Sequence, residues 1–233
     1  FSPDFVWVKQ RNTSRDHRLA NIISGTGKDL RSNANNAEIT DANGITAFNS
    51  DGFSVGTSTG WNQSSGTYVS WCWDAGSSTV SNTDGSITSS VRASQTSGFS
   101  VVSYTGSGTA PSTVGHGLNA APSLIFFKRT DTTSNWITYN SSLGADKYLV
   151  LNNTYAAATD SGPFNNTAAT SSVFTVNTFS DINASGGTYV AYCFAPVAGY
   201  SAFGSYTGNQ STDGPFVHLG FRPALIIFRN TGG

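Results

Sequence analysis

The sequence predicts an all-β fold built from tandem antiparallel modules of the β-sandwich or jelly-roll type. Its apolar runs are short, rich in Val, Ile, Phe, Tyr and Trp, and bounded by Gly, Pro, Asn or Asp, which is the pattern of β-strands. Only 11% of the 233 residues are charged, and Ser, Thr, Gly and Asn supply most of the polar positions. Several apolar runs also recur along the chain, which indicates repeated structural units.

Residues that favour helices are scarce. Glu38 is the only glutamate, and methionine is absent. We therefore expect no long helix and a single short one at residues 16–23.

The clearest repeat pairs GTYVSWCW at residues 66–73 with GTYVAYCF at residues 187–194, which lie 121 residues apart. At the same spacing, FSV at residues 53–55 matches FTV at residues 174–176. Two strands are therefore expected to recur in register. In the first, both alternating sets of side chains are mostly apolar, which predicts a central strand between two layers.

A third element occurs three times, as a proline, an apolar run and then a base: PDFVWVK at residues 3–9, PSLIFFK at 122–128 and PALIIFR at 223–229. Upstream of the second and third copies lies SYTG, at residues 103–106 and 205–208, followed by His116 and His218.

These repeats predict three modules and one connection. Residues 1–76 form a first module without its opening strand, residues 98–198 a complete second module, and residues 199–233 the opening strands of a third. We therefore expect the chain to be a stretch of a larger tandem protein. Residues 77–97 form either a Ser/Thr-rich linker or a small hairpin, and the Asp84-Gly85 turn signal between apolar residues favours the hairpin.

Candidate strands follow from the apolar runs. In chain order they are residues 5–9, 53–55, 67–73, 99–104, 124–128, 136–139, 148–151, 173–176, 188–194, 203–206, 216–219 and 225–229. The two cysteines, Cys72 and Cys193, occupy matching positions of two modules, so a bridge would have to join two cores. Both are expected to be free thiols.

Charge and hydropathy exclude some partners. The formal net charge is −1, the pI is about 6.3, and no run of Lys and Arg is present, so nucleic acid is not an expected partner. No apolar stretch approaches the roughly 20 residues that span a bilayer, so no membrane partner is expected either.

Catalytic and metal-binding patterns are missing from the sequence. One glutamate cannot provide the paired glutamates common in sandwich-fold glycanases, and the three histidines have no ligand-spaced neighbours. We therefore expect neither an enzyme nor a cofactor or metal. His116 and His218 recur in register, which favours a structural hydrogen bond within each module.

Two tryptophans are candidates to stack on sugars. Trp61, in TGWN, and Trp136, in SNW, each lie beside asparagine, and an amphipathic ring next to a polar side chain suits a carbohydrate face. The alternative for both is a loop aromatic that closes the end of a sandwich.

Four segments carry a resemblance to a known repeat: GFSVVSYTG at residues 98–106, GHGL at 115–118, the run from Pro122 to Arg129, and YVAYCF at 189–194. Together they resemble an uncharacterised repeat in long virion proteins of tailed bacteriophages, especially marine and cyanobacterial ones. The resemblance implies a place on the virion surface, in a tail fibre, spike or other appendage.

Together with the missing catalytic patterns, this resemblance leads us to expect a non-enzymatic structural protein that contacts other virion proteins and host surface glycans and forms a symmetric homo-oligomer such as a trimer. The alternative is a carbohydrate-binding module of a phage receptor-binding protein or bacterial adhesin. A polysaccharide depolymerase ranks below both.

Overall fold

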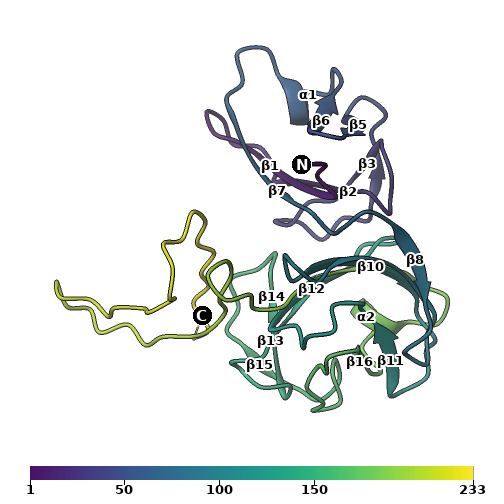
Figure 1. The fold of residues 1–233 in the computed structure, drawn as a ribbon, viewed down its shortest axis with the longest axis vertical. Helices are drawn as coiled ribbons and strands as arrows, with labels where there is room; N and C mark the ends of the chain where they lie inside the picture. The colour runs from purple at the N-terminus through teal and green to yellow at the C-terminus, as the bar shows by residue number, and fades with distance from the viewer. Residues whose placement is uncertain (233) are drawn as a thin grey trace.

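The fold is all-β and antiparallel, as the sequence predicts. The computed structural model describes residues 1–232, and among these residues two four-residue helices accompany seventeen strands. The strands stack in four layers (Figure 1), and the two central layers are sheets that pack face to face. Neither described helix is long or apolar enough to cross a membrane.

The first two layers come from the N-terminal third of the chain. The outer layer contains the hairpin β5 (Ile45–Asn49) and β6 (Gly52–Val55) with the helix α1 (Thr59–Asn62). Beneath it lies a three-stranded sheet in the order β2 (Arg18–Asn21), β1 (Phe5–Gln10), β7 (Tyr68–Trp73). The short strands β3 (Lys28–Asp29) and β4 (Ile39–Thr40) pair beside this sheet.

The third layer is an eight-stranded sheet. In spatial order its strands are β15 (Ala158–Thr159), β14 (Lys147–Val150), β13 (Trp136–Asn140), β12 (Leu124–Arg129), β17 (Thr188–Phe194), β10 (Phe99–Thr105), β9 (Ser89–Ser94) and β8 (Thr79–Asn82). The fourth layer holds the pair β11 (Ser112–Gly115) and β16 (Val173–Val176) with the helix α2 (Ser180–Asn183).

The repeated sequence segments within residues 1–198 occupy matching strands. β1 pairs with β7 as β12 pairs with β17, in the same register: Trp7 lies opposite Trp71, and Phe126 lies opposite Tyr192. The helices α1 and α2 also lie 121 residues apart. Sequence similarity in these segments therefore corresponds to structural similarity, whereas a longer tandem array stays a prediction.

The core between the two central sheets, which we call the seam core, joins the N-terminal part of the chain to the rest. It includes Phe5, Trp7, Phe126 and Phe194. Matching residues of the two sheets meet here: Trp7 contacts Phe126 at 6.5 Å between ring centroids, and Trp73 contacts Phe194 at 6.0 Å. The two sheets thus bury corresponding faces against each other. Separate cores lie on their outer faces.

The stretch at residues 77–97 forms the favoured hairpin. β8 and β9 pair antiparallel around a turn that contains Asp84 and Gly85. β9 also pairs antiparallel with β10, which places the hairpin at the edge of the eight-stranded sheet. Cys72 is half-buried and Cys193 is buried, and both are free thiols as expected.

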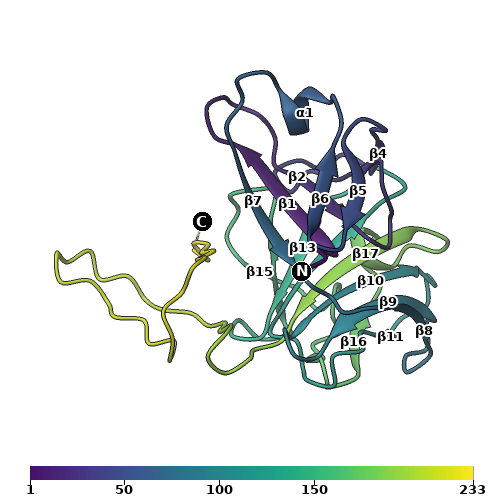
Figure 2. The same ribbon diagram turned by 45° about the horizontal axis from the view of Figure 1, so that its top comes forward.

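One predicted helix and three predicted strands are wrong. Residues 16–23 contain the strand β2 instead of a helix, because residues 18–21 pair along β1. The expected strands at residues 203–206, 216–219 and 225–229 are absent: the described residues from 199 onward form an extended arm that projects from the sheets (Figures 1 and 2). A β-strand requires a hydrogen-bonded neighbour, so the apolar sequence of these three segments does not by itself make them strands.

Candidate functional site

One open feature of the surface is a hydroxyl-lined cleft with a volume of about 330 Å³ above the eight-stranded sheet. Its floor follows the register of that sheet, because Ser81 of β8 lies opposite Ser90 of β9, and Ser90 lies opposite Ser103 of β10. The lining residues are Ile23, Ser24, Ser81, Thr88, Ser89, Ser90, Ser103, Tyr104, Thr105, Thr130, Thr188, Tyr189 and Val190. All of these side chains are uncharged at neutral pH, so the cleft suits a neutral polyhydroxylated ligand better than an ion.

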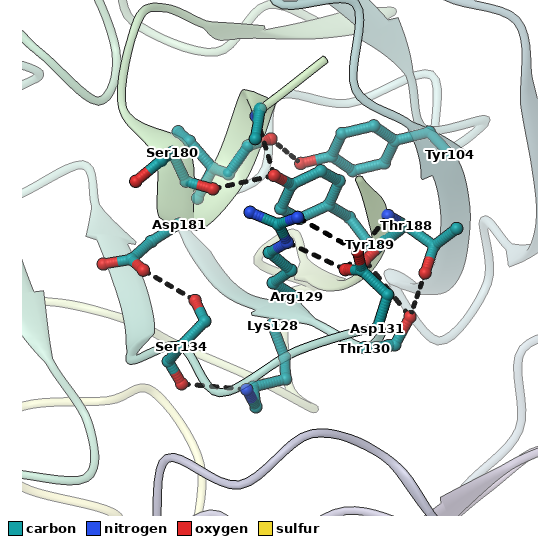
Figure 3. Close-up of polar contacts among 12 residues, drawn as sticks. Tyr104, Lys128, Arg129, Thr130, Asp131, Ser134, Ser180, Asp181, Thr188 and Tyr189 are labelled. Carbon is teal, nitrogen blue, oxygen red and sulfur yellow. Dashed lines mark hydrogen bonds and ion pairs between the residues drawn. The ribbon is translucent and has the colours of Figure 1, made fainter. Parts of the chain in front are cut away.

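A polar network includes the lining residues Thr130, Thr188 and Tyr189 (Figure 3). The Thr130 amide donates to the Thr188 carbonyl at 2.8 Å, and the two hydroxyls lie 2.7 Å apart. Beside them, the Arg129 guanidinium donates two hydrogen bonds to Asp131, at 2.8 and 3.0 Å. These hydrogen bonds hold the pKa of Asp131 below its usual value. The arginine is therefore already paired.

Two stacked tyrosines connect the sheet to α2. The rings of Tyr104 and Tyr189 lie 5.1 Å apart, and burial raises the pKa of both phenols. The Tyr104 hydroxyl donates to the Ile182 carbonyl at 2.8 Å. The Tyr189 hydroxyl donates to the Ser180 carbonyl and accepts from the Ala184 amide, both at 2.7 Å. These hydrogen bonds hold α2 against the sheet.

Lys128 is a buried amine beside this network. Its Nζ donates to the backbone carbonyls of Ser134, at 2.8 Å, and Asn35, at 3.4 Å. Burial lowers its pKa to about 8, against the opposing attraction of Asp181 and Asp131. Both acceptors are neutral carbonyls and the side chain is fully covered, so Lys128 acts as a structural donor.

Part of the network recurs in the N-terminal sheet. Tyr68, which matches Tyr189, accepts from the Gln63 amide at 2.8 Å and donates to the Thr59 carbonyl at 3.3 Å. The Arg11 amide donates to the Thr67 carbonyl as the Thr130 amide donates to the Thr188 carbonyl. Because the same hydrogen bonds occur in both sheets, we assign them a structural role in holding the strands and helices together.

Buried acids elsewhere are paired with arginines. Asp4, the residue before β1, forms an ion pair with Arg92 of β9 at 2.7 Å, which ties the two central sheets together. Asp29 pairs with Arg18, and burial raises its pKa to about 6 although Arg18 acts in the opposite direction. Each acid thus has a structural partner.

Trp61 and Trp136, the two residues predicted to contact sugars, are both buried. Trp61 is 3% exposed and packs under the β5–β6 hairpin, and Trp136 is 0% exposed. The Trp136 Nε1 donates to the Arg31 carbonyl at 2.8 Å, and its ring stacks on Tyr192. The expectation that these rings present a free face to a glycan is therefore wrong: α1 and the strand β13 place both rings inside cores.

His116 makes structural hydrogen bonds: its Nε2 lies 3.1 Å from the Thr170 carbonyl, and its Nδ1 accepts from the Leu118 amide at 3.3 Å. Within residues 1–232, no three His, Cys, Asp or Glu side chains gather as a metal site would require. The sequence does not reveal the cleft, because its hydroxyls come from separate strands and loops that only strand register brings together.

The fold and this surface thus describe an all-β domain with a hydroxyl-lined cleft on one sheet. The chain belongs to the DUF7483 family, a domain of unknown function, whose model matches residues 1–233. Comparison with curated proteins and with solved structures finds no match.

Proposed function

We propose that this chain is a non-enzymatic structural part of a bacteriophage virion, in a tail fibre, spike or other surface appendage. The observation that carries the proposal is the seam core, in which two sheets with matching strands bury corresponding faces and the ion pair Asp4–Arg92 crosses between them. Such stacking provides a stiff spacer whose units each have a further core of their own.

The surface chemistry supports the same proposal. Hydroxyl and amide side chains supply most of the polar surface, and the buried acids lie in ion pairs. A protein exposed on a particle gains from a nearly neutral surface, because it then attracts few polyions.

An antibody raised against the 233-residue chain tests this proposal. Immunogold electron microscopy of purified particles, from a host that carries the gene, is expected to label an appendage. A particle in which the gene is deleted serves as the control. Label that stays with cell debris, together with particles that lack the protein by mass spectrometry, would contradict the proposal.

Carbohydrate binding is a second candidate function, favoured by the hydroxyl-lined cleft rather than by the tryptophans. Glycan-array binding by the unmodified chain, lost in Ser90→Tyr, would support it, because Ser90 lies on the cleft floor and a phenol would fill the space. Gln95→Tyr, at an exposed position outside the cleft lining, is the matched control. Binding that survives Ser90→Tyr would exclude the cleft.

A further inference from the structure

The outer edge of β7 is an unfilled position in the N-terminal sheet. In the eight-stranded sheet, β17 lies between β12 and β10. β7 matches β17 in sequence and pairs with β1 on one side, but among residues 1–232 no strand pairs with its other side. The difference in burial is large: β17 is buried from Tyr189 to Phe194, whereas all of β7 is half-buried or exposed.

A polar side chain of α1 has fewer partners than its counterpart in α2. Asn183 of α2 is buried: its Nδ2 donates to the carbonyls of Asn177 and Thr109, and its Oδ1 accepts from the Ser107 amide. The matching Asn62 of α1 is exposed and keeps only the first of these bonds, to the Gly56 carbonyl at 2.9 Å. Residues 107 and 109 follow β10, so Asn62 lacks what a β10-like segment would supply.

The arm from residue 199 onward carries such a segment. Residues 205–208 repeat the SYTG of residues 103–106, so residues 201–207 correspond to β10. The counterparts differ in exposure: Tyr206 is 58% exposed against 5% for Tyr104, and Phe216 is 88% exposed against 0% for Val114. Large apolar side chains at these positions are solvated only while residues 201–216 have no partner strand.

The start of the arm already lies near the unfilled edge. Phe203 packs on the seam core, with its ring 6.3 Å from that of Phe194, and the Phe194 ring lies 6.0 Å from that of Trp73 at the end of β7. The Ser201 hydroxyl donates to the Ala195 carbonyl. The arm and β7 also lie on the same side of the molecule (Figure 2). A segment tethered this close has a high effective concentration at the edge.

From these observations we infer that the edge of β7 is a strand-binding site, and that its occupant is the chain's own residues 201–207. The register follows from that of β10 on β17, in which Ser100 lies opposite Cys193 and Tyr104 lies opposite Tyr189. It places Ala202 opposite Cys72, and Tyr206 opposite Tyr68. This site does not depend on the proposed function.

The proposed closure has several physical consequences. Backbone hydrogen bonds along β7 provide affinity, and the alternating side chains provide specificity, as in other cases of strand addition. The Tyr206 ring would stack on Tyr68 as Tyr104 stacks on Tyr189. The Asn62 Oδ1 would accept from the amide of Asn209, the counterpart of Ser107.

A one-residue change tests the closure in the full chain. In Ala202→Cys, the new thiol would lie opposite Cys72, at the Cα separation of about 4.5–5.5 Å that antiparallel partners share and a disulfide can span. Mild oxidation is expected to give a monomer in which Cys72 is bonded to the introduced thiol, identified by peptide mass spectrometry. Ser205→Cys, whose side chain would face the opposite side of the strand, is the matched control and is expected to form no such bond.

Hydrogen exchange of the unmodified chain provides a second measurement that needs no variant. Closure predicts that alternate amides in residues 201–207 exchange at least about tenfold more slowly than those of an unstructured segment. Covalent dimers of Ala202→Cys, joined between Cys72 of one copy and the introduced thiol of another, would show that a second copy fills the edge, which overturns the assignment of the occupant. Free thiols together with unprotected amides would overturn the site itself.

Discussion

At the scale of single residues, the polar side chains of the network beside the cleft have structural roles. Lys128 shows this most clearly, because a fully covered amine donates to two backbone carbonyls while burial lowers its pKa to about 8. An amine whose folded-state pKa lies below its unfolded value, about 10.4, is harder to charge in the folded protein.

The buried amine predicts a pH dependence of stability. Between about pH 8 and pH 10.4 the unfolded chain keeps a proton that folded Lys128 has lost, so the free energy of unfolding rises with pH by at most about 3 kcal/mol from this group. Urea unfolding of the unmodified chain and of Lys128→Met across this range measures this contribution as the difference between their slopes, because buried Cys193, whose raised pKa acts in the opposite direction, is common to both. Lys128→Met is expected to abolish it, and Lys9→Met, the matching position in β1, is expected to keep it. An unchanged slope in Lys128→Met would contradict the assignment.

The two matched tyrosines predict unequal costs. Tyr189→Phe leaves the Ala184 amide and the Ser180 carbonyl without their partner, and we expect a loss of about 1–3 kcal/mol. Tyr68→Phe should cost less, because Tyr68 is half-buried and water can replace its hydroxyl. Denaturant midpoints of the two variants measure the difference, and equal losses would argue against the distinction.

Trp61 and Trp136 illustrate where sequence reasoning fails at this scale. Each lies next to asparagine in a polar stretch, which suggested an exposed loop. Their burial is decided by distant partners: Trp136 donates to a carbonyl of Arg31, 105 residues away, and stacks on Tyr192. The sequence around each tryptophan contains no information about such long-range contacts.

At the scale of elements, recurring apolar segments predict strands well within residues 1–198. The repeated segments predicted β1, β7, β12 and β17, and the Asp84-Gly85 signal predicted the β8–β9 hairpin. The wrong predictions concern segments whose secondary structure depends on whether a neighbouring strand is available for pairing. Residues 18–21 became β2 because β1 offers an edge, and the arm forms no strand because none is paired with it.

The hairpin turn predicts a sensitive glycine. A Cβ on Gly85 would clash with the Thr113 carbonyl oxygen, which belongs to the backbone and cannot rotate away. Gly85→Ala is therefore expected to destabilise the protein by about 1–3 kcal/mol through a shift of the hairpin against β11. Gly52→Ala, where a Cβ meets open space, is the control and should change thermal stability little. A neutral Gly85→Ala would show that the turn tolerates this shift.

At the scale of the whole molecule, the seam core leads us to expect that the two central sheets unfold as one cooperative unit. Its members come from both sheets, so neither sheet keeps its inner face covered if the other unfolds. The hydroxyl-lined cleft depends on the same packing, since Ile23 and Ser24 come from the N-terminal part and the other lining residues from the remainder of the chain.

Unfolding is therefore expected to occur in one transition, with tryptophan fluorescence and far-ultraviolet circular dichroism giving the same midpoint. Phe126→Ala should lower the free energy of unfolding by about 3–5 kcal/mol and keep a single transition. Val80→Ala, at an exposed position of an edge strand, is the control. Two separate midpoints in the unmodified chain would show that the sheets unfold independently.

The seam core also limits how further sheets can be added. Because the two central sheets bury corresponding faces against each other, neither retains that face for another neighbour. The layers with α1 and α2 consequently point in opposite directions (Figure 1). If such sheets continue into a longer array, the unit that repeats by translation is a back-to-back pair, so any ligand or receptor would meet alternate modules in alternate orientations.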